Sequence, residues 1–383
     1  MKIRNAKVYT AGHRFETADL YINDGRIVPD LGQEDNNVFD AKGLLAIPGL
    51  VDTHIHGAAG VDFSVADASE IEKVARYEAE HGVTVIFPTT LTMTEDRLQR
   101  AMEQFRKYLD GDHEGVASIE GLHMEGPFFS KLHAGSQDIS AMCAPDHGLF
   151  KKLQETSGGM IKRLSLAPEL EGAMEFISAV HRDVRISIGH TDADYITANE
   201  AFVNGATGVT HLFNAMRGLH HRAPGPIAAA VECNAEAELI ADGVHVHPAM
   251  VRLAFSLFPD DKIILISDSI MGTGLPDGFC SLAGRDIYMD GPLAVLADDR
   301  QTIAGSITNL FDCMKRAVTE MGIPLEKAVK AASENPARSM GIEADYGSLT
   351  PGHYADILLV DRRLELKYVF KRGKLLKTIP TEI

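Results

Sequence analysis

Short apolar runs alternate with amphipathic stretches through the middle of the chain. From about residue 45, each run is followed by a polar loop and then by a segment with apolar positions at helical spacing. Eight such runs occur, and they are LAIPGLVDTHIH, VTVIFPTT, ASIEGLHME, IKRLSLAPE, VRISIGHT, TGVTHLFNA, AELIADGVH and KIILISDS. Eight β-then-α units predict an α/β fold, a TIM-like (β/α)8 barrel over residues 47–345 with its functional groups at the carboxyl ends of the strands.

Two of the connecting segments carry helix signals. Residues 94–111 begin with a threonine suited to capping and end at Gly111, and apolar positions recur between them at helical intervals. Residues 68–82 place Ile71 and Val74 on one face of a second helix. Both segments therefore predict helices that pack an apolar face against the barrel.

The two ends of the chain have a different pattern. Residues 1–46 predict short strands with an Asn-Asp-Gly turn at residues 23–25, and residues 346–383 have the same strand character. Because each piece is too small to hold a core of its own, we predict that they pair into one small β-sandwich domain beside the barrel.

A glycine-rich stretch at residues 272–278 follows the last predicted barrel strand. It lacks the lysine and the helix start that a nucleotide-binding loop needs. We predict instead a turn-rich excursion that leads into a hairpin over the mouth of the barrel.

Composition narrows the function mainly by exclusion. Fifty-four acidic against 37 basic side chains give a formal net charge of −17, which argues against nucleic acid or an anionic membrane as a partner. The sequence has no apolar stretch of about 18 residues and no signal-peptide pattern at its start. Its four cysteines lack the spacing of a zinc knuckle or a disulfide framework. These features predict a soluble, cytoplasmic protein.

Potential metal ligands follow several of the apolar runs. His54 and His56 are two positions apart on a predicted strand, so both rings point to the same side and can reach one ion. Two isolated histidines would be unremarkable, but other predicted strands end in the same way. The further candidates at strand ends are Glu125, His190, His211 and Asp268. Since the carboxyl ends of parallel barrel strands share one rim, the pattern predicts a metalloenzyme.

Six segments narrow the class further, and they are PGLVDTHIHG, HMEGPFFS, SIGHT, THLFNAM, ADGVHVHP and ISDS. In this order they resemble the N-acetylglucosamine-6-phosphate deacetylases of the amidohydrolase superfamily, over nearly the whole chain. The resemblance implies metal-dependent hydrolysis of N-acetyl-D-glucosamine 6-phosphate to D-glucosamine 6-phosphate and acetate.

The same resemblance implies one or two divalent ions per subunit. The resemblance implies that Glu125 takes the bridging role. The fourth strand agrees with this, because it ends LSLAPE without the lysine that bridges two metals in many amidohydrolases. Asp268 would border the metal site and act as general base and then general acid. Zinc is the first expectation, and iron or manganese suits the same ligands. The implied ligand sets are His54, His56 and Glu125 for one ion, and Glu125, His190 and His211 for the other.

Substrate contacts are also implied by the resemblance. Arg222 would pair with the phosphate, since a guanidinium can form two parallel hydrogen bonds to it. His245 would contact the sugar. The other implied positions are Ser136, Asn214, Ala215, Ala304, Gly305 and Ser306.

One position departs from the family pattern. Several relatives carry a histidine that polarises the acetyl carbonyl where this chain has Gln137. The glutamine amide can still donate a hydrogen bond, although it carries no charge. His133 is an alternative donor, and the metal could also hold the oxyanion by itself.

Other functions stay open at this point. The nearest is a deacetylase for another N-acyl hexosamine phosphate, such as the galactosamine epimer. An N-acyl amino acid deacylase, a cyclic amidase and a non-catalytic protein of the same fold are more remote. The family resemblance also implies a homodimer, with His220 and His221 in a loop near the neighbouring subunit.

Overall fold

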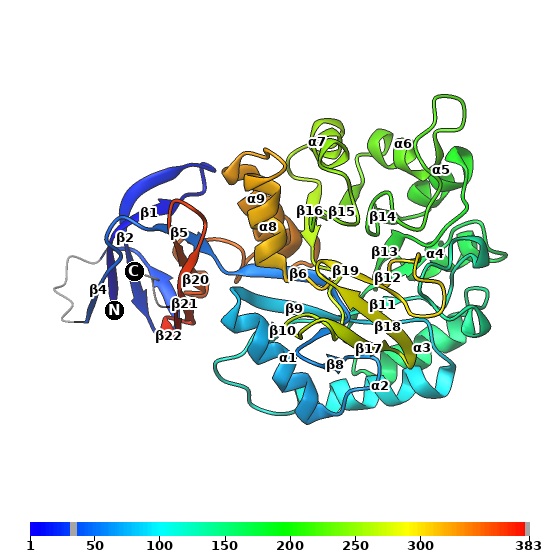
Figure 1. The fold of residues 1–383 in the computed structure, drawn as a ribbon, viewed down its shortest axis with the longest axis horizontal. Coiled ribbons are helices and arrows are strands. Elements are labelled where there is room, and N and C mark those ends of the chain that lie inside the picture. Colours follow the sequence, from blue (N-terminus) through cyan, green and yellow to red (C-terminus); the bar gives the residue numbers. More distant parts are fainter. Residues whose placement is uncertain (31–36, 380–383) are drawn as a thin grey trace.

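A (β/α)8 barrel forms the centre of the protein (Figure 1). The structure is a computed structural model that describes residues 1–30 and 37–379. Every barrel strand is followed by a helix, which confirms the predicted fold class. The pairs are β6 (Leu50–Ile55) and α1 (Ala68–Glu80), β9 (Val83–Thr90) and α2 (Glu95–Leu109), β11 (Leu122–Glu125) and α3 (His147–Thr156), β12 (Ile161–Leu166) and α4 (Ala173–Val180), β13 (Arg185–Ile188) and α5 (Tyr195–Val203), β14 (Ala206–Val209) and α6 (Gly225–Glu232), β15 (Glu236–Ile240) and α7 (Pro248–Leu257), and β16 (Ile263–Ile266) and α8 (Leu310–Thr319).

Shorter elements complete the barrel domain. Strand β10 pairs with β9, and β7 pairs with β8 at the start of the first loop. None of the helices in the described part of the chain has the length and apolar character needed to cross a bilayer. The remaining bounds are β7 (Gly57–Ala58), β8 (Val61–Asp62), β10 (Ser118–Ile119), the 3-10 helices Lys131–His133 and Ile139–Ala141, α9 (Leu325–Ala332) and α10 (Glu334–Ser339).

The first and last barrel strands meet at the carboxyl-terminal rim. The backbone N–H of Asp268 donates to the carbonyl of His54 at 3.0 Å, and that of His56 donates to Ser269 at 2.8 Å. These bonds bring the end of β6 against the end of β16. Candidate ligands from opposite ends of the barrel segment therefore share one rim.

Strands from both chain ends form a second sheet beside the barrel (Figure 1). Its order is β22-β21-β20-β5-β1-β2-β3, with β4 paired to β1, and the antiparallel pair β20–β5 joins the two ends. Asn23 pairs with Arg26 around the predicted turn. The bounds are β1 (Lys2–Tyr9), β2 (Phe15–Asn23), β3 (Arg26–Val28), β4 (Val38–Asp40), β5 (Leu45–Pro48), β20 (Ile357–Val360), β21 (Leu366–Lys371) and β22 (Lys374–Thr378).

The predicted first barrel strand proves to be two strands in two sheets. Its first part, β5, belongs to the terminal sheet, and only β6 enters the barrel. Gly49 separates them, and a Cβ at this residue would lie 2.2 Å from the Thr84 hydroxyl, so only glycine fits this crossing. The domain limits at residues 46 and 346 stay a prediction, and residues 31–36 and 380–383 of that domain lie outside the described residues.

A buried ion pair ties the terminal sheet to the base of the barrel. Lys371 at the end of β21 places its Nζ 2.7 Å from Asp356, 2.9 Å from the carbonyl of Thr84 and 3.1 Å from the Ser118 hydroxyl. Lys371 and Asp356 are both buried. Because every donor of the ammonium has an acceptor, the charge is tolerated between the two units.

The glycine-rich excursion leads into a three-stranded antiparallel sheet. Its strands are β17 (Gly278–Leu282), β18 (Arg285–Asp290) and β19 (Leu293–Leu296). The predicted hairpin is the pair β18–β19, and β17 is an additional strand.

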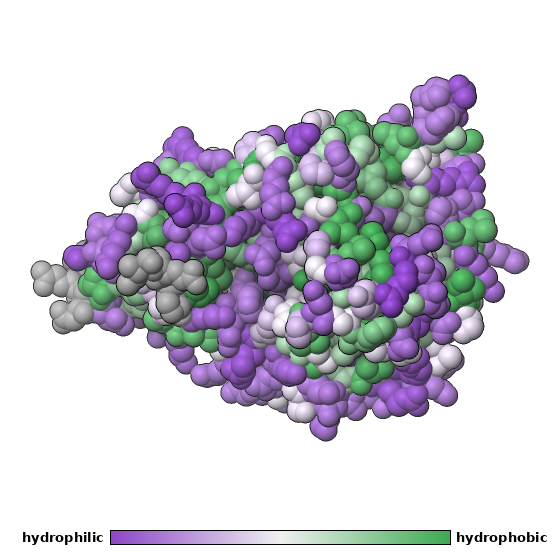
Figure 2. All heavy atoms as spheres, viewed as in Figure 1, coloured by the Kyte–Doolittle hydropathy of each residue, from purple (hydrophilic) through white to green (hydrophobic). Residues whose placement is uncertain are grey.

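On the face seen in Figure 2, hydrophilic residues dominate, and apolar ones gather over the middle of the barrel. Phe279 on β17 is 67% exposed.

One buried carboxyl group in α1 should make the free energy of unfolding depend on pH. Glu78 is fully buried, and neither carboxyl oxygen has a hydrogen-bond partner. Burial, with the charges of Asp52 and Asp312, raises the pKa of Glu78 well above its usual value. The folded protein thus holds this group neutral while the unfolded chain ionises it. Its contribution to stability is full below the unfolded pKa of about 4.3 and falls by about 1.4 kcal/mol per pH unit above it, until the folded group also ionises.

We therefore expect Glu78→Met to raise the free energy of unfolding by about 1–3 kcal/mol at pH 7. The increase should be smaller at pH 4, where the carboxyl group is largely neutral in the unfolded chain as well. Urea unfolding at both pH values measures the effect. Glu103→Met, at an exposed position of α2, is the matched control and should leave stability nearly unchanged. A destabilised Glu78→Met protein would contradict the neutral, unpaired carboxyl.

Candidate metal centre and active site

The predicted ligands all lie at the carboxyl-terminal rim of the barrel. His54 is within β6 and His56 directly follows it, while Glu125 is the last residue of β11. The other three each stand two residues beyond a strand, and they are His190 after β13, His211 after β14 and Asp268 after β16. The structure therefore brings together all six residues that the sequence predicts.

The backbone turns sharply at three of these positions. His190, His211 and Asp268 have φ angles of 46°, 33° and 51°. These angles lie in the left-handed region, which the backbone of non-glycine residues rarely adopts. Each such residue costs of order 1–3 kcal/mol and persists only where the surrounding structure enforces it. The turn ends the strand and directs the side chain toward the axis of the barrel.

The side chains converge on Glu125, which is 1% exposed. The Nε2 atoms of His54, His190 and His211 lie 3.4, 3.4 and 3.1 Å from its Oε1. His56 Nε2 lies 3.4 Å from its Oε2. Asp268 closes the other side, with Oδ1 3.5 Å from His54 Nε2 and 3.3 Å from His56 Nε2.

The hydrogen bonds of the Nδ1 atoms set the tautomers of these rings. Nδ1 of His56 lies 3.2 Å from the carbonyl of Thr89, that of His190 2.8 Å from the carbonyl of His133, and that of His211 3.2 Å from the carbonyl of Asn214. A carbonyl can only accept, so we assign the proton to Nδ1 in each ring. His54 Nδ1 faces the carboxylate of Glu238 at 3.3 Å. In the neutral rings, the Nε2 lone pairs are thus directed at one point.

The charges of the side chains around Glu125 favour binding of a cation between the ligand histidines. Burial by itself would raise the pKa of Glu125, but the His54 charge and hydrogen bonds from His190 and His211 hold it well below its usual value. Burial would lower the pKa of His56, but Asp268 and Glu125 raise it to about 9. A site that stabilises positive charge on its imidazoles also stabilises a cation between them.

The donor set fits one or two divalent ions. Two groups of three ligand atoms within 4.8 Å of one another share Glu125, and they match the two predicted ligand sets. Imidazole and carboxylate ligands of this kind suit zinc, iron and manganese. Asp268 borders the first group rather than completing either of them.

A cavity of about 310 Å³ opens above these ligands. Of the predicted substrate contacts, Ser136, Gln137, Asn214, Ala215, His245, Ala304 and Gly305 line it. Ser306 is buried beside it and bonds to Thr308. The sequence pattern did not identify the other lining residues, because only long-range packing brings their segments over the rim. They are Leu91, Gly135, Leu282, Gln301 and Ile303.

Comparison with known proteins places this centre in a family. A profile described as the amidohydrolase family matches residues 45–376. The chain belongs to the amidohydrolase family. Its members are metal-dependent hydrolases that act on amide bonds, in agreement with the ligand groups at the rim.

Several relatives and solved structures resemble this amidohydrolase over nearly its whole length. It is 34% identical over 378 residues to the N-acetylglucosamine-6-phosphate deacetylase of Lysinibacillus sphaericus, covering 97% of both chains. It is 32% identical to the N-acetylgalactosamine-6-phosphate deacetylase of Escherichia coli O157:H7, covering 88% of this chain and 89% of the relative. An Asp-to-Ala variant of N-acetyl-D-glucosamine-6-phosphate deacetylase from Mycobacterium smegmatis, solved in complex with N-acetyl-D-glucosamine-6-phosphate, is 31% identical, has a TM-score of 0.91 and is matched over 99% of both chains.

Gln137 has both ends of its amide engaged in this amidohydrolase. Its Oε1 accepts a hydrogen bond from the backbone N–H of Thr92 at 2.7 Å, and its Nε2 donates to Oε2 of Glu125. The Thr92 bond fixes which end of the amide faces the metal centre. In this structure Gln137 supports the carboxylate with one of its two N–H donors, and its side chain lines the cavity.

Two predicted contacts lie outside the cavity of the amidohydrolase. The His133 ring places Nε2 3.0 Å from Asp192, so it faces away from the ligands. Arg222 is exposed, and its Nη1 lies 2.7 Å from His221 Nε2. No Lys or Arg is among the described residues that line the cavity.

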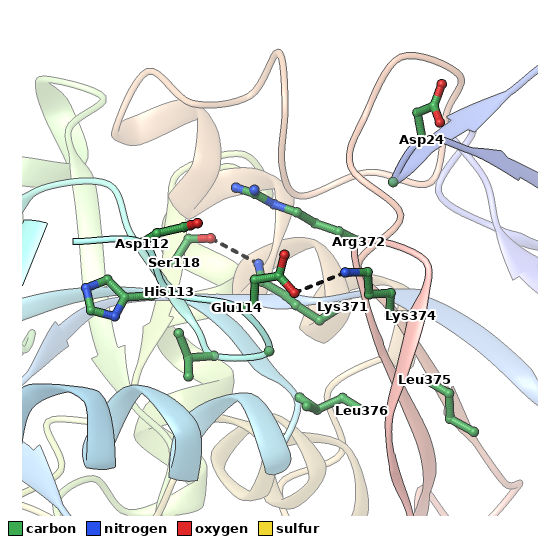
Figure 3. A pocket seen from close by; sticks show the side chains of 13 residues that line it. Asp24, Asp112, His113, Glu114, Ser118, Lys371, Arg372, Lys374, Leu375 and Leu376 are labelled. Carbon is green, nitrogen blue, oxygen red and sulfur yellow. Dashed lines mark hydrogen bonds and ion pairs between the residues drawn. The ribbon is translucent and has the colours of Figure 1, made fainter. Parts of the chain in front are cut away.

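A larger cavity of about 560 Å³ lies at the opposite end of the barrel, between it and the terminal sheet (Figure 3). Its three cationic residues already have partners. Lys371 bonds to Asp356, Lys374 lies 3.1 Å from Glu114, and the Arg372 guanidinium lies 4.4 Å from the centroid of the Tyr354 ring. None of the metal-ligand groups found among residues 1–30 and 37–379 lies in this cavity, and volume by itself does not make a site. The smaller cavity of the amidohydrolase carries the chemistry.

Proposed function

We propose that this amidohydrolase hydrolyses the N-acetyl group of N-acetyl-D-glucosamine 6-phosphate to give D-glucosamine 6-phosphate and acetate. The observation that carries the proposal is the convergence of four imidazoles and two carboxylates on the floor of one cavity. The names of the relatives that match nearly the whole chain support the choice of substrate.

Amide hydrolysis needs a nucleophile stronger than neutral water. The four histidines and Glu125 would hold a divalent cation, which would supply the activation of the attacking water that amide hydrolysis needs. Asp268 takes the proton from the attacking water, since its carboxylate lies at the edge of the ligand cluster. As the carbon–nitrogen bond breaks, Asp268 returns this proton to the departing amine, and acetate keeps the water oxygen.

We propose zinc as the resident metal, with one or two ions per subunit. The imidazole and carboxylate groups of the two ligand sets, which share Glu125, are the kinds of ligand that zinc takes in proteins. Iron or manganese is the alternative for the same donor set.

The sugar lies in the cavity between His245 and the backbone of Asn214 and Ala215. His245 is held by Asp242, whose Oδ2 lies 2.7 Å from its Nδ1. This contact leaves Nε2 of His245 available to a sugar hydroxyl or the phosphate.

The phosphate requires a cation that the cavity does not itself provide. Arg222 is the proposed donor, and it lies in a segment, residues 217–223, that is exposed without interruption. We propose a homodimer in which this segment reaches the neighbouring subunit. We also propose a cytoplasmic location, because the spacing of the four cysteines in the sequence does not suggest a disulfide framework.

Replacing Arg222 tests this assignment. We expect Arg222→Ala to raise KM for N-acetylglucosamine 6-phosphate by about 10–100-fold, because a charge-assisted pair contributes about 1.5–3 kcal/mol. KM for unphosphorylated N-acetylglucosamine should change little. Arg182→Ala, which removes another cation outside the cavity, is the control. Equal changes for both sugars would remove Arg222 from the phosphate site.

Acetate release by the purified, metal-loaded protein tests the proposed function. The substrates are N-acetylglucosamine 6-phosphate, its galactosamine epimer and unphosphorylated N-acetylglucosamine. The second candidate, the epimer, is favoured by the similarity to an N-acetylgalactosamine-6-phosphate deacetylase. Preference for the epimer would change the substrate and keep the mechanism. No release from any of them would point to other N-acyl substrates, such as N-acyl amino acids, or to a non-catalytic protein.

A further inference from the structure

The barrel interior beneath the metal centre is polar, although barrels usually fill this space with bulky branched side chains. Arg163 on β12 and Glu238 on β15 are both fully buried and form an ion pair. Around them lie further fully buried polar residues, Thr53, His123, Ser165, Ser187 and Thr210. Burying an ion pair costs free energy that apolar packing would avoid, so its place beneath the metal centre calls for a role.

His54, His123 and Glu238 are near enough to form a third metal-ligand group, but their other contacts argue against that use. The Glu238 Oε1 atom accepts from the Arg163 guanidinium and, at 3.1 Å, from the Thr53 hydroxyl. His123 has both nitrogens engaged, 3.1 Å from the carbonyl of Thr53 and 2.7 Å from the Ser165 hydroxyl. A guanidinium in contact with the carboxylate would also repel a second cation.

The remaining oxygen of Glu238 faces the metal centre. Its Oε2 lies 3.3 Å from Nδ1 of His54, whose Nε2 lies among the ligand atoms. The other three ligand histidines each have a backbone carbonyl at Nδ1. His54 is thus the one proposed ligand with a carboxylate behind it among the described residues.

We infer that Glu238 is a positioning residue for His54, and that Arg163 holds Glu238 in place. A carboxylate that accepts the Nδ1 proton keeps Nε2 free for the metal, orients the ring and makes Nε2 a stronger ligand. The Arg163 charge compensates the carboxylate inside the barrel. The pair would therefore tune the His54–His56 half of the centre without contacting substrate. This inference rests on the proposed metal-dependent function.

Metal affinity, measured without substrate, tests the role of Glu238. We expect Glu238→Gln to weaken binding of one equivalent of Zn²⁺ by about 10–100-fold in competition with a chromophoric chelator. The visible spectrum of the Co²⁺-loaded protein should change as well, since the orientation of one ligand changes. Glu236→Gln is the matched control, because Glu236 contacts the same Arg163, at 3.4 Å, and has no recorded contact with His54.

A second variant separates positioning from folding. Glu238→Gln removes the fully buried carboxylate beside Arg163 and leaves only Glu236, at 3.4 Å, to compensate the guanidinium. The double variant Glu238→Gln with Arg163→Met removes both charges of the buried pair. We expect it to unfold at a higher urea concentration than Glu238→Gln and still to bind Zn²⁺ about 10–100-fold more weakly than the wild type. Wild-type affinity and an unchanged Co²⁺ spectrum in the folded double variant would overturn the inference. A wild-type protein that binds no divalent cation would instead refute the proposed function, and this inference with it.

Discussion

Replacing Asp268 by asparagine should lower kcat by about 10²–10⁴-fold, the usual contribution of a positioned general acid–base group. Asparagine has nearly the same size but cannot take a proton from water. Burial by itself would raise the pKa of Asp268, but the His56 hydrogen bond and the surrounding imidazoles lower it, so the group is ionised at neutral pH. Steady-state kinetics on the metal-loaded variant measure the effect.

The metal content of the variant shows whether kcat falls because the general base is missing or because the metal has been lost. Both ligand sets are complete without Asp268, so Asp268→Asn should bind as much metal as the wild type. Asp298→Asn is the control, because this side chain is 73% exposed and lies outside the cavity. Near wild-type kcat in a metal-loaded Asp268→Asn protein would show that another group moves the proton.

Removing the metal should abolish turnover and weaken the fold. The ligand atoms come from β6, β11 and the loops after β13 and β14, so one bound ion links distant parts of the barrel. Binding to the folded state alone stabilises a protein by about 4 kcal/mol when the free ion exceeds its Kd by about 1,000-fold. We expect chelator treatment to reduce acetate release below detection and to lower Tm.

Re-addition of single metals then identifies the productive ion. We expect Zn²⁺ to restore both acetate release and Tm, and Fe²⁺ or Mn²⁺ to restore them in its place if zinc is not the resident metal. Chelator followed by excess Zn²⁺ controls for damage by the chelator. Full activity in protein with less than about one tenth of an ion per chain would rule out the metal-dependent mechanism.

The candidate ligands that the structure brings together as the sequence predicted lie on strands or within two residues after them. His54 and Glu125 could be placed because side chains alternate along a strand and the strands of a barrel run parallel. His190 could be placed in the same way, although it lies two residues after β13. A connection of two residues is too short to move the side chain away from the carboxyl-terminal rim of the barrel.

Side chains in longer loops were not predictable in the same way. Gln137 takes its direction from the backbone N–H of Thr92, which is 45 residues away in the sequence. His133 turns to Asp192, 59 residues away. A loop pattern contains no information about such partners, because the direction of each side chain depends on what packs against it.

The sequence by itself determined the fold class and the family and placed the candidate metal ligands at one rim, since these follow from local periodicity, from motifs and from residues at strand ends. Only the tertiary structure decided that Gln137 donates a hydrogen bond to Glu125. It also decided that Arg222 lies outside the cavity of the same subunit. The contact between Arg163 and Glu238 beneath His54 is a third result of the tertiary structure. The physical reason is that these contacts join side chains from different strands and loops. Their distances are set by closure of the barrel, and no local pattern specifies them.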